Sequence, residues 1–146
     1  MDIQQLNNVY AAGLFDGEGT VTLIKQGKLS KFKAPTVSLT STTYELIKFM
    51  KDNYGGHIRN QKVYKEHHKK AYCWQLRYNN ALEFLTKLNP YIKEPAKKKR
   101  IELLINKYKK VTKSNGKYSE QEAIKKHAFE EEFFTHTVSS LPENVK

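Results

Sequence analysis

Apolar positions near the N-terminus recur at helical spacing, whereas the next apolar positions alternate with polar ones. The helical pattern covers residues 4–16 and is carried by Leu6, Val9, Tyr10, Gly13 and Leu14. We expect Gly17 and Gly19 to end this helix. The residues that follow are β-branched and alternating, so they predict a hairpin of strands 20–26 and 34–42 across a polar turn.

A second helix is predicted directly after this hairpin. The pattern covers residues 42–54 and directs four side chains inward: Leu46, Ile47, Phe49 and Met50. Thr42 or Thr43 is the expected N-cap, and Glu45 completes a capping box if Thr42 is the cap. Gly55 and Gly56 are expected to end the helix.

The hairpin and the helix are then repeated, and two further helices follow. Residues 57–65 and 71–78 predict the second hairpin, with a helix over 80–88 after it. Residues 97–110 predict a basic helix with Ile101, Leu104, Ile105 and Tyr108 on one side. Residues 119–134 predict an appended helix.

This order of elements indicates an α+β fold, in which one antiparallel sheet carries helices on one face. Residues 1–112 would form the core domain, and residues 113–146 a linker, the appended helix and a flexible tail. The inner face of the sheet would carry Val21, Leu23, Val37, Leu39, Ile58, Trp74 and Leu76. The outer face would be polar and basic, with Thr20, Thr22, Gln26, Thr36, Ser38, Thr40, Arg59, Gln61, Gln75 and Arg77.

The charge of the chain indicates a polyanionic partner. The net charge is +11, and residues 1–112 hold 21 Lys and Arg against 9 Asp and Glu, whereas residues 113–146 hold 5 against 6. Such a basic body is typical of nucleic-acid-binding proteins. No run of about 18 apolar residues predicts a membrane span, and the N-terminus does not resemble a signal peptide. The single cysteine, Cys73, suits a reducing intracellular compartment.

The predicted outer face has the side chains that contact DNA in a major groove. Hydroxyl, amide and guanidinium groups meet base edges and phosphates there. An ordinary solvated strand face would have the same pattern, and the charge of the chain favours double-stranded DNA. We add Lys28, Lys33 and His57 as candidate DNA contacts. His67 and His68 lie in a lysine-rich loop and do not predict a metal site.

Residues 11–19, "AAGLFDGEG", place two carboxylates among glycines at the end of the first helix. This segment resembles the motif of the LAGLIDADG homing endonucleases, and the order of elements is similar to the αββαββα core of that family over residues 5–110. The motif matches at Ala12, Gly13, Leu14, Asp16 and Gly19. Ala11 replaces the first Leu, and Glu18 stands where the family has Asp or Glu. The resemblance implies a saddle-shaped sheet that binds DNA.

The resemblance also implies a homodimer, because the chain carries one copy of the motif and the family pairs two motif helices. Small residues leave one stripe of the helix without bulk, so Ala12, Gly13, Asp16 and Gly17 are the expected dimer interface. Pairing would bring two Glu18 carboxylates together, and their repulsion favours a shared cation. The family implies Glu18 and the Gly17 carbonyl as ligands of Mg²⁺, with Mn²⁺ or Ca²⁺ as alternative occupants. Asp16 is expected to fix the helix end by accepting hydrogen bonds from backbone amides.

Phosphodiester hydrolysis also needs a cation near the developing charge. The family has a basic residue near the start of the helix after the second hairpin, and here the run "AKKKR" offers Lys97 first and Lys98 next. The same lysines could instead contact only the DNA backbone. Ser41, or Thr42 beside it, could hold water molecules in the site.

These inferences predict a sequence-specific, Mg²⁺-dependent DNA endonuclease that cuts both strands as a homodimer on a pseudo-palindromic site. No small-molecule cofactor and no membrane partner are expected. Related proteins are encoded in introns or mobile genes, which suggests an organelle matrix, a bacterial cytoplasm or a phage-infected cell. The alternative is an intron maturase or a DNA- or RNA-binding regulator that uses the same scaffold without cleavage.

Overall fold

The computed structural model describes residues 1–61 and 69–137. The predictions for residues 62–68, which include His67, His68 and part of the second hairpin, lie outside the described residues. Residues 138–146, in the predicted flexible tail, also lie outside the described residues.

The described elements follow the predicted order. They are α1 (Ile3–Glu18), β1 (Gly19–Ile24), β2 (Ala34–Ser41), α2 (Tyr44–Tyr54), β3 (His57–Asn60), β4 (Tyr72–Arg77), α3 (Tyr78–Leu88), α4 (Pro95–Leu103) and α5 (Glu120–Thr135), with short helical turns around α4. The strands form one antiparallel sheet in the order β1-β2-β4-β3. The α+β class and the arrangement of the core are therefore confirmed.

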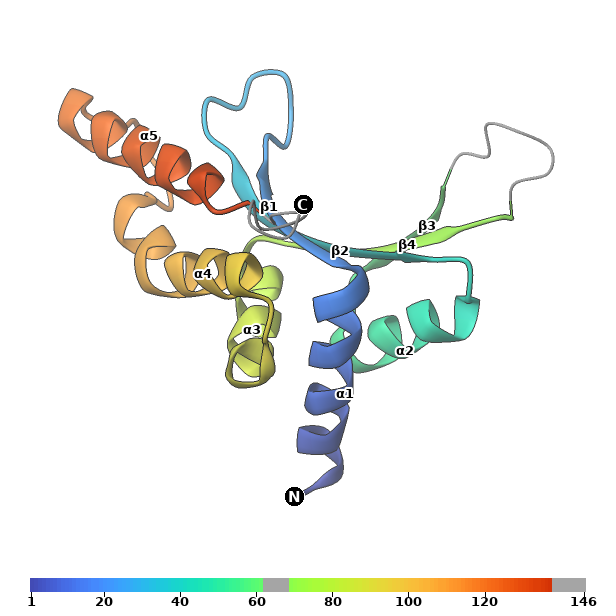
Figure 1. The fold of residues 1–146 in the computed structure, drawn as a ribbon. Helices are drawn as coiled ribbons and strands as arrows, with labels where there is room; N and C mark the ends of the chain where they lie inside the picture. Colours follow the sequence, from blue (N-terminus) through green and yellow to red (C-terminus); the bar gives the residue numbers. More distant parts are fainter. Residues whose placement is uncertain (62–68, 138–146) are drawn as a thin grey trace, which may run out of the picture.

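Helices α1 to α4 lie on one side of the sheet, and the connection between β1 and β2 rises on the other side (Figure 1). The predicted inner face is confirmed by the register, which places Val21 opposite Val37 and Val37 opposite Leu76. These side chains are buried in one core with Trp74, whose indole N–H donates to the Gly55 carbonyl at 2.7 Å. The apolar face fixes the register, because a slip by one residue would expose it.

Helix α1 is longer than predicted and contains Gly17. Asp2 and Gln5 form a capping box at its start. The helix runs through Glu18, and Gly19 caps it while beginning β1. The glycine at position 17 therefore does not end the helix, and the acidic end of α1 passes directly into the sheet.

Gly19 is the position where α1 and the sheet come closest. A Cβ atom at Gly19 would lie 2.2 Å from Cδ1 of Phe15. The Phe15 ring is fully buried and packs edge-on against Phe84 at 5.5 Å between ring centroids. Because the ring cannot move aside without disturbing this packing, only glycine fits at position 19.

Replacing Gly19 with Ala is therefore expected to destabilise the fold by about 1–3 kcal/mol through overpacking against Phe15. Urea unfolding followed by circular dichroism measures this loss. Gly27→Ala is the matched control, because its Cβ would have only Ser30 Oγ nearby, at 3.8 Å. Equal stabilities of the two variants would contradict the proposed contact.

The prediction for the start of α2 is confirmed in its second alternative, Thr43, whereas the prediction of one continuous helix over 97–110 is wrong. The N-cap of α2 is Thr43, and its side chain makes no capping hydrogen bond, so the capping box of Thr42 and Glu45 is absent. Instead, the Thr43 amide donates to Ser41 Oγ at 3.0 Å. The predicted continuous helix 97–110 is divided into α4, a π-helical segment (Leu104–Tyr108) and a 3₁₀ turn (Lys109–Val111).

Helix α5 packs against the rest of the protein through both apolar and charged buried residues. Phe129 and Phe133 join the main core. Lys126 is 1% exposed, donates to Thr112 Oγ1 and lies 4.2 Å from the centre of the Tyr108 ring. Burial lowers the pKa of this lysine to about 8. Within the described part of the chain, no helix is long and apolar enough to cross a membrane.

Candidate functional site

The C-terminal end of α1 brings together three groups that the sequence singled out. Glu18 is the last residue of the helix and is exposed. Asp16 and Lys97 lie beside it, and both bind main-chain atoms rather than one another. This cluster therefore consists of one exposed carboxylate with two supporting side chains.

Asp16 joins α1 to the segment that precedes α4. Its two carboxylate oxygens accept hydrogen bonds from the backbone amides of Lys93, at 2.9 Å, and Glu94, at 3.1 Å. The predicted chemistry, a carboxylate that accepts from backbone amides, is present, but these amides belong to a segment far along the chain. Since both oxygens are occupied, Glu18 is the more available carboxylate for a cation.

Lys97 caps the end of α1. Its ammonium group donates to the carbonyls of Phe15, at 3.1 Å, and Asp16, at 2.6 Å. Such a cation is favourable at a helix C-terminus, where the carbonyl dipoles are unsatisfied. Burial lowers the pKa of Lys97, and the carboxylates of Glu94, Asp16 and Glu18 partly oppose that lowering. An ammonium group is thus held in the electrostatic field of Glu18.

The basic run after Pro95 is divided among different neighbours because successive helical residues point about 100° apart. Lys97 turns toward α1, whereas Lys98 donates to the Asn89 carbonyl. Lys99 is exposed. Arg100, which the sequence analysis did not single out, donates to the Val21 carbonyl of β1 at 2.9 Å. Of the candidate lysines, the structure brings only Lys97 to the end of α1.

Ser41 lies at the end of β2 that is next to the end of α1. Gly19 pairs with Leu39, and β2 continues from Leu39 to Ser41. The Ser41 side chain accepts a hydrogen bond from the Thr43 amide. Its oxygen is therefore oriented by the turn into α2.

The outer face of the sheet carries a polar row that crosses all four strands. In the register, Thr20 is opposite Ser38, Ser38 is opposite Gln75, and Gln75 is opposite His57. A second row joins Thr22, Thr36 and Arg77, and a third joins Thr40, Cys73 and Arg59. The rows combine polar side chains with arginines toward the β4 and β3 side, and Cys73, at 2% exposed, is buried within the third row.

Two of the predicted DNA-contacting residues do not offer a free surface. Thr36 is 1% exposed, and its hydroxyl donates to the Ala34 carbonyl, so the expectation of an exposed side chain is wrong. Lys33 places its ammonium 4.6 Å from the centre of the Phe134 ring of α5. Lys28 is exposed, whereas Gln26 and Gln61 lie just outside the strands and are half-buried.

One stripe of α1 is apolar and exposed. Ile3, Leu6 and Tyr10 are 75%, 53% and 51% exposed, and Gly13 and Gly17 continue the stripe toward Glu18. A Cβ atom at either glycine would have no neighbour within 4 Å. This stripe therefore leaves room for another backbone to approach closely, and it ends at the exposed carboxylate.

The comparisons with known proteins identify the fold. No family model matches the sequence, and no curated protein matches it. Among solved structures, the homing endonuclease I-CvuI in complex with the I-CreI target is 16% identical, with a TM-score of 0.70 over 95% of this chain and 87% of that chain. The archaeal intron-encoded homing endonuclease I-Vdi141I, complexed with DNA, is 14% identical, with a TM-score of 0.61 over 96% and 89%.

A third structure, the I-LtrWI LAGLIDADG homing endonuclease bound to target DNA, is 15% identical, with a TM-score of 0.60 over 98% of this chain and 48% of that chain. The chain has the LAGLIDADG homing endonuclease fold. Residues 11–19, which resemble the LAGLIDADG motif, form the end of α1 and the first residue of β1. The motif therefore lies where the helix meets the sheet.

The described structure also changes the expected interface of the LAGLIDADG helix. Ala12 is fully buried within its own chain and is not available to a second copy. Asp16 is engaged with the amides before α4. Gly13 and Gly17 remain exposed. Ile3, Leu6 and Tyr10 were not predicted as surface residues, although the helical spacing of Leu6 and Tyr10 with Gly13 was a usable signal.

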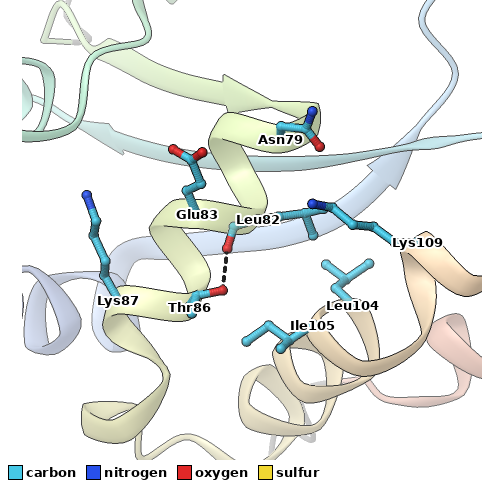
Figure 2. Close-up of a pocket in the computed structure, with 8 residues that line it drawn as sticks. All are labelled: Asn79, Leu82, Glu83, Thr86, Lys87, Leu104, Ile105 and Lys109. Carbon is cyan, nitrogen blue, oxygen red and sulfur yellow. Dashed lines mark hydrogen bonds between the residues drawn. The ribbon is translucent and has the colours of Figure 1, made fainter. Parts of the chain in front are cut away.

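A pocket on the helical side of the molecule is separate from these groups. Figure 2 shows its lining residues on α3 and on the helical segment after α4: Asn79, Leu82, Glu83, Thr86, Lys87, Leu104, Ile105 and Lys109. None of the predicted site residues lines this pocket. The candidate site is therefore the open surface formed by the end of α1 and the outer face of the sheet.

Proposed function

We propose that this protein is a sequence-specific double-strand DNA endonuclease that works as a homodimer with a divalent cation. The observation that carries the proposal is the end of α1, where an exposed Glu18 follows an exposed apolar stripe and lies beside the Lys97 ammonium. A helix that only braced a monomer would bury its apolar stripe. A binding protein would gain repulsion, not affinity, from carboxylates beneath a phosphate backbone.

The outer face of the sheet is the proposed DNA surface. Its polar rows carry exposed Thr20, His57, Arg59 and Arg77. The net charge of +11 favours a polyanion, and the solved structures of this fold described above are DNA complexes. Hydrogen bonds from such side chains to base edges would supply specificity.

The donor set at the end of α1 suits Mg²⁺. Among the described residues, no group of three His, Cys, Asp or Glu is placed to hold a metal ion. Mg²⁺ does not need such a group, because it is bound by one or two carboxylates together with phosphate oxygens and water. Glu18 and the Gly17 carbonyl would hold it, with the second copy's Glu18 completing the site. When bound, the ion would lower the pKa of a water molecule and stabilise the leaving oxygen.

The side chains around Glu18 would stabilise charge at the phosphate or position the groups beside it. Lys97 would stabilise the negative charge that develops on the phosphate. Asp16 would hold α4 against α1 and thereby fix Lys97 relative to Glu18. Ser41 would orient water molecules at the end of β2.

The homodimer can be tested at Gly13. Replacing Gly13 with Leu is expected to leave the fold of the chain intact, because a Cβ atom there has no neighbour within 4 Å. The same side chain would block the close approach of a second α1. Analytical ultracentrifugation should give twice the 17.0 kDa mass for the wild type and the single mass for the variant.

Gly27→Leu is the control, since it makes the same substitution in an exposed connection. A dimeric Gly13→Leu variant, or a wild type that stays monomeric at micromolar concentration, would contradict the proposed interface.

Endonuclease activity is tested with a plasmid that carries the DNA flanking the protein's own gene. The protein is incubated with this plasmid with and without Mg²⁺, and a linear product is expected only with the metal. Binding without cutting, under Mg²⁺, Mn²⁺ and Ca²⁺ alike, would contradict the endonuclease proposal and favour a maturase or regulator on the same scaffold.

A further inference from the structure

The connection between β1 and β2, residues 25–33, extends from the sheet on the side away from α1 to α4 (Figure 1). It carries Lys25, Lys28, Lys31 and Lys33. Within the connection itself, the hydrogen bonds of the described residues are few: the Ser30 amide donates to the Gly27 carbonyl, and the Gln26 side chain donates to the Ile24 carbonyl. A connection with so few internal bonds needs another support to hold one conformation.

Helix α5 supplies that support. The Glu130 carboxylate accepts a hydrogen bond from the Lys33 backbone amide at 2.8 Å, across 97 residues of sequence. The Phe32 ring lies 4.7 Å from the Tyr118 ring and 4.9 Å from the His127 ring, centre to centre. The end of the connection is thus held by both a polar and an aromatic contact.

The glutamates in the acidic run of α5, residues 130–132, have different partners, which their charge alone did not predict. Glu130 is only 8% exposed and binds the Lys33 amide. Glu132 is exposed and forms an ion pair with Lys107 at 3.3 Å, on the other side of α5. A carboxylate is costly to bury, and it is tolerated here because it accepts from an amide and lies near the Lys126 ammonium.

We propose that α5 positions the 25–33 connection for base recognition in duplex DNA, with Glu130 and Phe32 as positioning residues. This inference rests on the proposed function, in which the outer face of the sheet binds DNA. Held by α5, the exposed lysines of the connection, Lys25, Lys28 and Lys31, approach the duplex in one arrangement. Released from α5, they would still attract phosphates but would lose their register on the bases.

Glu130→Leu and Glu130→Gln test the proposal as a matched pair. Both remove one negative charge, so their electrostatic attraction to DNA is equal. Gln keeps an oxygen that can accept from the Lys33 amide, whereas Leu does not. Glu132→Leu is a further control, because it removes a charge from the same helix without touching the connection.

The wild-type full-length protein is first used to select duplexes from a pool of randomised sequence. Each folded variant is then measured against the selected duplex and its single-base-pair variants. We expect Glu130→Gln to keep the wild-type profile. We expect Glu130→Leu to lose about tenfold discrimination over one block of base pairs, the scale of a base-pair contact, with discrimination elsewhere and non-specific affinity unchanged. Hydrogen exchange of the amides in 27–33 should be faster in this variant.

Equal base-pair profiles for the Leu and Gln variants, or an equal loss at every base pair, would overturn the positioning role while leaving the endonuclease proposal intact. A wild type that selects no duplex would overturn both. If Glu130→Leu does not fold, Phe32→Leu makes the same test from the other side of the contact, because it removes the ring contacts to Tyr118 and His127 and leaves α5 unchanged.

Discussion

Replacing Glu18 with Gln is expected to abolish DNA cleavage and to leave DNA binding largely intact. The amide keeps the size of the side chain but removes the negative charge that would hold the cation. Loss of several kcal/mol of transition-state stabilisation lowers the rate by about 10³-fold or more. Cleavage of a supercoiled plasmid measures the rate, and fluorescence anisotropy of a labelled duplex measures binding.

Glu83→Gln is the control for this substitution, because Glu83 is exposed on α3 and lines the pocket that is separate from the end of α1. The control should cut like the wild type. Persistent cleavage by Glu18→Gln would show that the acid has been assigned wrongly.

Replacing Lys97 with Met is the second substitution with a large expected effect. We expect the cleavage rate to fall by about 10²–10³-fold, because the ammonium group would no longer stabilise charge at the phosphate. Lys99→Met removes the same charge from an exposed position on the same helix and should change the rate little. Single-turnover cleavage at saturating protein separates this effect from weaker binding.

The pH dependence gives Lys97 a second readout. Burial lowers the pKa of Lys97 below the ordinary 10.5, so its charge is lost at a lower pH than that of a surface lysine. The cleavage rate should therefore fall as pH rises toward that range. Lys97→Arg keeps its charge there and should flatten the fall. An unchanged profile would separate Lys97 from the chemistry.

Local patterns in the sequence predicted most of the elements. The alternation of Val21, Leu23, Val37 and Leu39 defined a buried face, and burial of that face is what fixes the strands. The motif predicted the acidic end of α1, because glycines and carboxylates there have few other roles.

Features that depend on distant parts of the chain were not predictable in this way. Thr36 alternates like its exposed neighbours but is buried. The residues of the basic run have the same composition, and only the packing of α4 against α1 and β1 distinguishes Lys97 from Lys98. The contact of Glu130 with Lys33 joins segments that no local periodicity relates.

Among the described residues, the hydrogen bonds that join α4 and the segment before it to α1 and β1 run from a side chain to the main chain. Asp16 binds two backbone amides, Lys97 binds two backbone carbonyls, and Arg100 binds the carbonyl of Val21. Every residue type presents those partner atoms. The side chains opposite can therefore change without loss of these hydrogen bonds, which suits a fold shared with structures that are only 14–16% identical.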